Sequence, residues 1–147
     1  MASEQQLCTF YLHDMLLGVK VQHVQEILAC QQMTRVPLAP TTIRGQIITA
    51  VDLRRRLGLP DRLMEIQPMN IVLRTRDGLM SLLVDEIGEV ITVDEASFER
   101  TPLTLTGPIR DLLLGAYKLH DQLLLSLDIE RLTAREAREG QLAPSTL

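Results

Sequence analysis

Three stretches of the chain share one pattern: an apolar run, a tight polar turn and a second apolar run. The stretches are Leu7 to Val19, Met69 to Asp85 and Leu112 to Leu127, and their turns carry His13-Asp14, Arg76-Asp77-Gly78 and His120-Asp121. Short aliphatic runs that are bounded by Asp and Gly turn residues are typical of β-hairpins. The pattern therefore predicts three β-hairpins.

Further strand candidates lie between these hairpins, at Thr34 to Pro37, Gln46 to Asp52 and Glu89 to Val93. Together they give about nine or ten short strands at close spacing, which is typical of small barrels or sandwiches. We therefore expect a mainly β fold.

Helical signals are few and short. In Val21 to Leu28 the apolar residues have the spacing of one helical face, which predicts a short helix or a turn there. The run Leu53 to Leu57, followed by Gly58, predicts a single helical turn that ends at glycine. From Asp128 onward, Ile129 and Leu132 predict the apolar side of a C-terminal helix that reaches Glu139.

The composition limits the classes of function. Aromatic residues make up 3% of the chain and Trp is absent, so the core must be aliphatic. The net charge of -4 and the few aromatic rings do not favour nucleic-acid binding, which relies on basic surfaces and stacking. We see no signal peptide and no apolar run of membrane-spanning length, so we expect a cytoplasmic protein.

No residue pattern predicts a metal, a cofactor or a nucleophile. The cysteines and histidines are Cys8, Cys30, His13, His23 and His120, and they lack the short paired spacings of a zinc site. Without an export signal, both cysteines are expected to be reduced thiols. The glycines are isolated, so the chain lacks a glycine-rich phosphate loop.

Two carboxylate pairs, Asp85-Glu86 and Asp94-Glu95, are candidates for a general acid and base. Both pairs sit at strand ends, where solvated turn carboxylates are common, and that interpretation is favoured. Arg54-Arg55-Arg56 could contact phosphate, but a solvated helical turn is favoured there as well. The sequence therefore predicts a protein that is not an enzyme. The alternative is a small hydrolase or ligand-binding barrel that uses His23 or Asp85-Glu86, and it requires these side chains to converge in one pocket.

Val24 and Ile27 lie among polar residues, with Glu26 between them. An apolar centre with a charged rim is how protein-binding surfaces are built. The two residues could equally fill the core, and from the residues alone both interpretations stay open.

The order of motifs resembles the CheW coupling proteins of bacterial chemotaxis. The matching stretches are Val24-Gln25-Glu26-Ile27, Met33 to Pro40, Ile43 to Arg54, Leu83 to Val90 and Leu123 to Glu130. Each motif alone is weak, but the five occur in the family order over about residues 7 to 133.

The resemblance implies two small SH3-like five-stranded barrels, packed together with exchanged strands, and a short C-terminal helix. The CheW-like domain would span residues 7–133, with the connection between its two subdomains near 58–68. Residues 134–147 would form the helix end and a flexible tail.

The resemblance also implies a role: a non-catalytic scaffold, without cofactors, that joins the regulatory domain of the histidine kinase CheA to the cytoplasmic tip of a methyl-accepting chemoreceptor. The alternative within the same fold is a regulatory module that binds a kinase without bridging to a receptor.

The resemblance further implies the binding residues. Val24 and Ile27 would belong to the receptor-facing groove, and Glu26 would be the family's carboxylate. Ile43 and Arg44 would lie in the turn whose Arg can pair with that carboxylate, while Gly45 and Asp52 would have structural roles in turns.

The chain departs from the family pattern between Pro40 and Asp52. The family usually has two consecutive turns there, and this chain has only Ile43-Arg44-Gly45. The chain is about six residues shorter there, and six residues of extended chain span about 20 Å. This predicts either altered partner affinity at this edge or a strand-swapped homodimer, because short hinges favour domain swapping.

Overall fold

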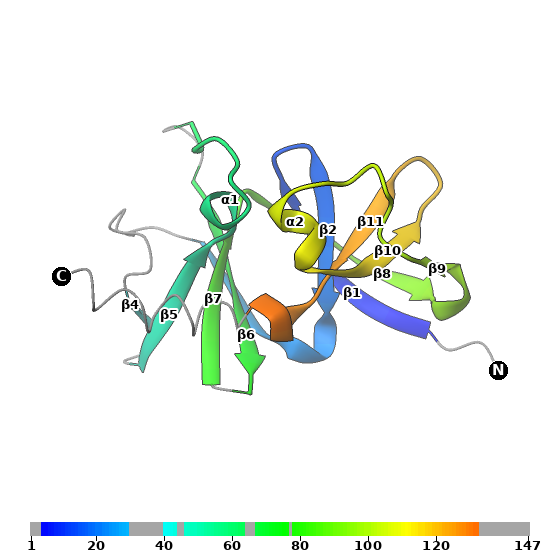
Figure 1. Ribbon diagram of the computed structural model, residues 1–147. Coiled ribbons are helices and arrows are strands. Elements are labelled where there is room, and N and C mark those ends of the chain that lie inside the picture. The colour runs from blue at the N-terminus through cyan, green and yellow to red at the C-terminus, as the bar shows by residue number, and fades with distance from the viewer. Residues whose placement is uncertain (1–3, 30–39, 44–45, 64–66, 77, 133–147) are drawn as a thin grey trace.

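The computed structural model describes residues 4–29, 40–43, 46–63, 67–76 and 78–132. For residues 40–43, 46, 47 and 49 it describes the backbone only. The described residues form two β-sheets, a few short helices and one shared core (Figure 1). The mainly β fold expected from the sequence is confirmed.

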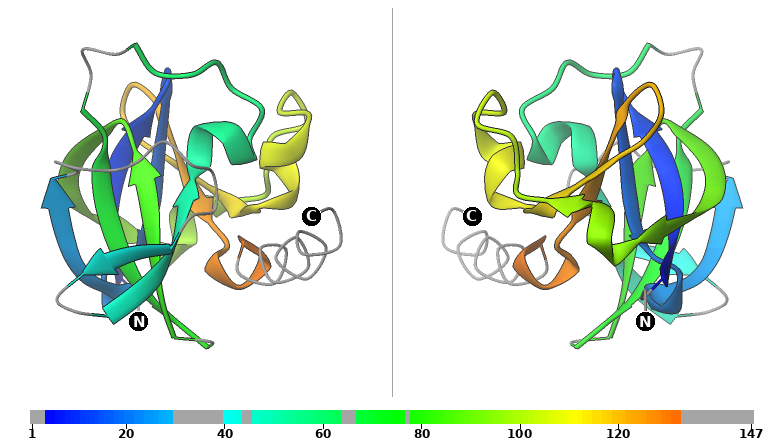
Figure 2. Two further views of the ribbon diagram at one scale, coloured as in Figure 1. Left: turned by 90° about the vertical axis from the view of Figure 1, so that its left-hand side faces the viewer. Right: turned by 90° about the vertical axis from the view of Figure 1, so that its right-hand side faces the viewer.

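The first sheet has six strands in the order β8-β1-β2-β11-β10-β9. Their bounds are β1 Glu4–Leu12, β2 Met15–Lys20, β8 Glu86–Asp94, β9 Phe98–Glu99, β10 Leu113–Lys118 and β11 Leu123–Leu127. The second sheet has five strands in the order β3-β6-β7-β5-β4. Their bounds are β3 Val24–Ala29, β4 Pro40–Ile43, β5 Gln46–Asp52, β6 Met69–Thr75 and β7 Gly78–Val84. In the left view of Figure 2 the five-stranded sheet is nearer the viewer, and in the right view the six-stranded sheet is nearer.

All three predicted hairpins are present, as β1–β2, β6–β7 and β10–β11. In the first turn, His13 has a φ of 58°, a left-handed conformation that only a few residue types adopt readily. The predicted strand at Gln46 to Asp52 is β5, and the one at Glu89 to Val93 lies within β8. The candidate at Thr34 to Pro37 lies outside the described residues.

The segment Val21 to Leu28 is not a helix. A single 3-10 turn, η1, covers Val21–His23, and β3 follows it at once. β3 pairs antiparallel with β6, with an irregularity in register between Val24 and Glu26. The apolar spacing of this segment fits a helix and a bulged strand alike. The ladder with β6 decides between them, because such tertiary pairing overrides weak local propensity.

The residues at the ends of the short helices explain where these helices begin and end. α1 spans Leu53–Arg56 and is capped by Asp52, whose side chain accepts a hydrogen bond from the Arg54 backbone N. Gly58 ends this turn with a φ of 71°, as predicted. α2, Pro108–Asp111, was not predicted, although proline in a first helical turn is a recognised start signal.

The C-terminal helix begins where the sequence predicted. Residues Ile129 to Leu132 are helical, and the Asp128 carboxylate accepts a hydrogen bond from the Arg131 backbone N at 3.1 Å. The part of this helix expected up to Glu139 lies outside the described residues.

The two sheets exchange strands. The N-terminal hairpin β1–β2 belongs to the same sheet as the C-terminal strands, and β2 pairs parallel with β11. The chain passes between the sheets twice, through η1 and through Asp85, the single residue between β7 and β8. The segment 58–68 instead joins α1 to β6, so it connects elements of the five-stranded part of the chain. Sequence could not show this, because a proline-rich loop marks a surface connection without saying which sheets it joins. The limits 7–133 and 134–147 stay predictions.

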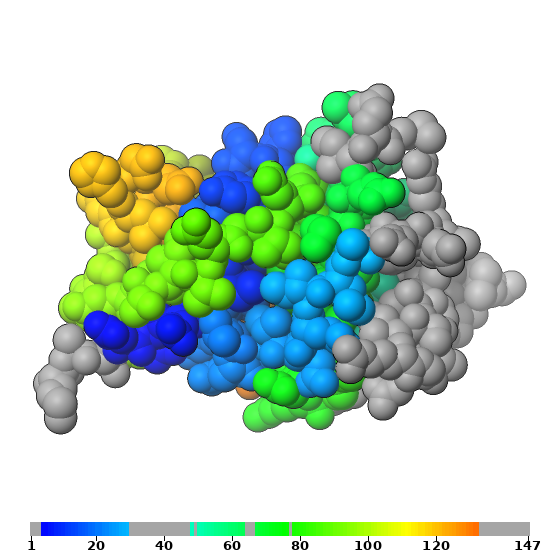
Figure 3. All heavy atoms as spheres, turned by 180° about the vertical axis from the view of Figure 1, so that it is seen from behind, coloured from blue at the N-terminus to red at the C-terminus, as the bar shows by residue number. Residues whose placement is uncertain are grey.

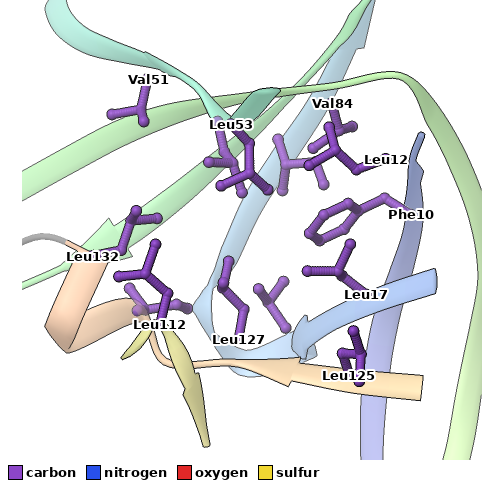
Figure 4. Packing of buried hydrophobic residues seen from close by; sticks show 14 of the residues in the cluster. Phe10, Leu12, Leu17, Val51, Leu53, Val84, Leu112, Leu125, Leu127 and Leu132 are labelled. Carbon is purple, nitrogen blue, oxygen red and sulfur yellow. The ribbon is translucent and has the colours of Figure 1, made fainter. Parts of the chain in front are cut away.

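One main core lies between the sheets and takes side chains from both (Figure 4). Phe10 and Leu17 come from the six-stranded sheet, and Leu73 and Leu82 from the five-stranded sheet, and all four are fully buried. Burying such a side chain contributes roughly 1.5–3 kcal/mol. The predominantly aliphatic core expected from the composition is confirmed. Within the described ranges, no helix combines the length and the apolar character that crossing a membrane requires.

Candidate protein-binding surface

Strand β3 lies at one edge of the five-stranded sheet, and among the described strands β6 is its only partner. An edge strand presents backbone N–H and C=O groups that can pair with another chain. Burial alternates along β3: Val24, Glu26 and Leu28 are half-buried, whereas Gln25, Ile27 and Ala29 are exposed. β3 therefore combines an open backbone edge with an exposed apolar side chain, Ile27 at 38% exposure.

Val24 and Ile27 have different surroundings. Val24 packs against the main core, and Ile27 is exposed to solvent. Burial alternates from residue to residue along β3 despite the register irregularity between Val24 and Glu26, so Val24 and Ile27 fall on opposite sides of the pattern. The two interpretations that the sequence left open therefore divide between these residues: core packing describes Val24 in this structure, and surface exposure describes Ile27.

Strand β8 forms the corresponding edge of the six-stranded sheet. Its exposed apolar residue is Val90, at 59% exposure, which lies opposite the buried Cys8 on β1. The space-filling view shows atoms of β8, in yellow-green, and of β3, in light blue, on one face of the molecule (Figure 3). We call the exposed parts of these two edge strands the β3/β8 surface.

Sequence analysis missed Val90, although a signal was present. In Glu89 to Val93, Ile91 and Val93 occupy the alternate positions that pack against buried residues. Val90 is out of phase with them, so the period-2 pattern puts it on the other face. An out-of-phase valine in a strand is a weak sign of a binding surface, because single exposed apolar residues are common.

Asp85 accepts hydrogen bonds from two arginines. Arg54, on α1, donates from Nε to Oδ1 at 2.8 Å and from Nη2 to Oδ2 at 2.6 Å. Arg62 donates from Nε to Oδ1 at 2.7 Å. The backbone N of His13, in the β1–β2 turn, donates to Oδ2 at 2.8 Å. Asp85 is thus bonded to elements of both sheets.

The network extends to Asp52 and to the backbone. Arg62 donates from Nη1 to Asp52 Oδ2 at 3.2 Å, and Arg54 donates from Nη1 to the Pro60 carbonyl at 2.6 Å. The side chains of Arg54 and Asp85 are 10% and 13% exposed. We call Asp52, Arg54, Arg62 and Asp85 the inter-sheet ion cluster. Asp52 therefore has two structural roles, as the cap of α1 and as a member of this cluster.

The cluster shifts two pKa values. Burial alone would raise the pKa of Asp85, but the hydrogen bonds from Arg54 and from the His13 backbone, with the positive charges of Arg62 and Arg54, hold it below its ordinary value. The hydrogen bond to Asp85 raises the pKa of Arg54 despite its burial. Both groups are therefore charged at neutral pH.

The expectation that Arg54 and Asp85 lie in solvated turns is wrong. The two residues are 31 positions apart, and each alone has the sequence surroundings of an exposed turn residue. The parallel pairing of β5 with β7, in which Asp52 lies opposite Leu83, brings them together at the ends of these two strands. Of the neighbouring pair, Asp94 caps the 3-10 turn η2, Glu95–Ser97, by accepting from the Ala96 N at 2.9 Å.

The side chains proposed for a hydrolytic pocket do not converge. His23 lines a groove beside the β6–β7 turn, and Asp85 is not among the residues that line it. Asp85 lies at the other end of these strands, where β7 meets β8. Among the residues that the structure describes, no cluster of three or more His, Cys, Asp or Glu side chains could hold a metal ion.

The turn implied to pair with Glu26 lies partly outside the described residues. Arg44 and Gly45 are not described, and of Ile43 only the backbone is. Ile43 pairs with Gln46, which closes the β4–β5 ladder over a two-residue link. The pairing of Arg44 with Glu26 stays a prediction.

Comparison with known proteins places these features in a family. The family model of the CheW-like domain matches residues 6–137, which is most of the chain. The chain belongs to the CheW family.

Individual CheW proteins match over most of their length. The chain is 27% identical over 137 residues to the chemotaxis protein CheW of Treponema pallidum, covering 86% of this chain and 81% of that protein. It is 30% identical over 104 residues to CheW of Bacillus subtilis, covering 67% of each. The crystal structure of the scaffolding protein CheW from Thermoanaerobacter tengcongensis matches with a TM-score of 0.74 and 26% identity, covering 85% of this chain and 89% of that one.

The match to the CheW crystal structure agrees with the two sheets that exchange strands in this chain. In this CheW-family chain, the β3/β8 surface is formed at the open edges of both sheets, and the inter-sheet ion cluster joins the two sheets at Asp85. The β3/β8 surface presents strand edges and apolar side chains to a partner. The charges of the inter-sheet ion cluster are instead paired with one another within the protein.

Proposed function

We propose that this protein is a non-catalytic scaffold of bacterial chemotaxis that couples the histidine kinase CheA to the cytoplasmic tip of a methyl-accepting chemoreceptor. Family membership supports the general role. The observation that carries the proposal is the β3/β8 surface: atoms of both strands lie on one face of the molecule, and each strand has an exposed apolar residue, Ile27 and Val90.

The β3/β8 surface would take the receptor tip. An amphipathic helix binds a groove through apolar anchors three or four residues apart, and a centre of Ile27 and Val90 with polar neighbours suits that mode. Val24 would support the surface from beneath, because it packs on the core. Glu26 would contribute the rim carboxylate, with Ile43 and Arg44 beside it.

The regulatory domain of CheA would occupy a different surface, so that the kinase and the receptor bind at the same time. Such a scaffold acts by holding its partners in fixed geometry, and it requires no reacting group and no cofactor. The proposal places the protein in the cytoplasm, where receptor tips and kinase meet. A regulatory module that binds the kinase alone is the alternative.

The strand-swapped homodimer is a separate hypothesis. In the structure Ile43 of β4 lies opposite Gln46 of β5. Size-exclusion chromatography with light scattering distinguishes a swapped dimer from a monomer, and a strictly monomeric protein removes the swap.

The test is a pull-down of this chain with a chemoreceptor tip and a CheA regulatory domain, singly and together. We expect Ile27→Glu and Val90→Glu to abolish binding of the tip and to preserve binding of the kinase domain. Both side chains are exposed, so the substitutions should leave the fold intact. Leu103→Glu is the matched control, because Leu103 is 87% exposed and lies outside β3 and β8.

The outcomes separate the two roles. If the unmodified chain binds the kinase domain but not the tip, the regulatory module replaces the scaffold. If Leu103→Glu weakens tip binding as much as Ile27→Glu does, the β3/β8 surface is not the receptor site.

A further inference from the structure

A groove lies at the end of the molecule where β6 turns into β7. It has a volume of about 830 Å³ and is bordered by both sheets and by the start of the C-terminal helix. In Figure 1 this end is at the bottom, away from α1 and α2. Pockets of this size hold a small ligand or a few side chains of a bound peptide.

The groove is cationic, although the whole chain is acidic. Among the described residues that line it, four cationic side chains, Lys20, Arg74, Arg76 and Arg131, outnumber two carboxylates, Asp128 and Glu130, without counting His23. The chain as a whole has a net charge of -4. Such a local reversal of sign attracts a negatively charged group to this groove.

One ion pair within the groove, Arg76–Glu130, is open to exchange. Arg76 Nε lies 4.0 Å from Glu130 Oε1, and the two side chains are 84% and 77% exposed. Exposed pairs of this kind contribute little to stability, so a partner's carboxylate can replace the internal one at small cost. Within the described part of the chain, no ion pair occupies Lys20.

The wall of the groove includes apolar side chains. Leu114 is half-exposed there, beside the buried Leu127 and Ile129. A cationic rim around an apolar wall matches a segment that alternates carboxylates with an aliphatic residue. The apolar wall at Leu114 has no counterpart in the phosphate backbone of a nucleic acid, so the lining favours an acidic peptide.

Arg74 connects this groove to β3. Its guanidinium donates to the Gln22 carbonyl at 3.0 Å and to Gln25 Oε1 at 3.0 Å, and it therefore holds the entry into β3. A carboxylate bound beside Arg74 would lie next to β3, the strand that we propose as part of the receptor-binding surface. The groove is nevertheless distinct from the β3/β8 surface, because neither Ile27 nor Val90 lines it.

We propose that this groove is a second docking site and that it binds an acidic segment of a protein partner. The segment contributes carboxylates to Lys20 and Arg76 and an aliphatic side chain to the wall at Leu114. The inference stands on the groove alone and does not require the proposed role in receptor coupling.

The test is fluorescence anisotropy with a short fluorescein-labelled peptide of alternating Glu and Leu, at low and at physiological salt. A matched peptide with Gln in place of Glu is the first control. We expect the Glu peptide to bind and Arg76→Glu to weaken its binding about tenfold, because an attraction at Arg76 would become a repulsion. Arg100→Glu is the matched control variant, because Arg100 is exposed and does not line the groove.

Backbone amide NMR shifts locate the peptide. Shifts centred on Lys20, His23 and Arg76 support the proposal. The proposal is overturned if the Glu peptide does not bind, if the Gln peptide binds as well, or if Arg100→Glu weakens binding as much as Arg76→Glu. It is also overturned if light scattering shows self-association that Arg76→Glu abolishes, since the occupant is then a second copy of this chain.

Discussion

Arg54 and Asp85 form a two-point ion pair at the place where the chain crosses from one sheet to the other. The distances are 2.8 Å from Nε to Oδ1 and 2.6 Å from Nη2 to Oδ2. Arg54 lies on α1, which follows β5 of the five-stranded sheet, and Asp85 also accepts from the His13 backbone in the six-stranded sheet. The pair therefore restrains the two sheets relative to each other, and with them the edges that carry Ile27 and Val90.

Removing the Asp85 carboxylate should destabilise the fold strongly. Asp85→Ala leaves Arg54 and Arg62, each 10% exposed at the side chain, without their main acceptor. Breaking a buried pair in this way costs about 3–5 kcal/mol. The free energy of unfolding, measured by urea titration, checks this. Asp121→Ala, at an exposed turn position, is the control and should leave the value unchanged. An equal midpoint for the two variants would contradict a structural role for the cluster.

The same carboxylate predicts a pH dependence of stability. The folded-state pKa of Asp85 lies below its ordinary value of 3.8, so the unfolded chain takes up the proton first as the pH falls. The stabilisation is complete above the unfolded pKa and is lost as the pH falls through the folded pKa. We expect the difference in unfolding free energy between the unmodified protein and Asp85→Asn to be constant near pH 7 and to shrink below about pH 4. A difference in unfolding free energy that increases as the pH falls would contradict this prediction.

Cys8 should be unreactive in the folded protein. It is buried in the main core, and burial raises the pKa of its thiol, so little thiolate is present at neutral pH. In a Cys30→Ser background, we expect a thiol reagent to label Cys8 slowly in buffer and rapidly in denaturant. The absorbance of the released thiolate from Ellman's reagent measures both rates. Fast labelling in buffer would mean that β1 opens readily.

Gly115 should not tolerate a side chain. A Cβ atom there would overlap the Glu99 carbonyl and the Phe98 ring, which belong to the neighbouring strand β9. Backbone cannot move aside as a flexible side chain can, so Gly115→Ala should displace β9 and lower the unfolding free energy by about 1–3 kcal/mol. Leu114→Ala, at the half-exposed preceding position of β10, is the comparison and should cost less. Equal stabilities would show that β9 is loosely held.

Features encoded by neighbouring residues were predictable. The three hairpins follow from Asp and Gly turn residues between aliphatic runs, and α1 follows from the run that ends at Gly58. Turn and cap chemistry acts over a few residues, so turns and helix ends can be predicted from a single sequence.

Features that depend on distant pairing were not predictable from local chemistry. The segment that begins at Val24 has a spacing that suits a helix, and only its ladder with β6 makes it a strand. The exposure of Val90 depends on β8 being the last strand of its sheet. The chain's resemblance to the CheW family led to Val24, Glu26 and Ile27 as site residues, but it did not lead to Val90.

The sequence by itself determined an aliphatic, mainly β chain with three hairpins, the single turn of α1 and the start of a C-terminal helix, because these depend on side-chain period and turn chemistry. The tertiary structure alone decided that the N-terminal hairpin joins the C-terminal strands, that Arg54 pairs with Asp85, and that β3 and β8 are edge strands of the described sheets with atoms on one face. Strand pairing brings together residues far apart in the chain, and the free energy of such contacts depends on the whole packed core rather than on any local run of residues.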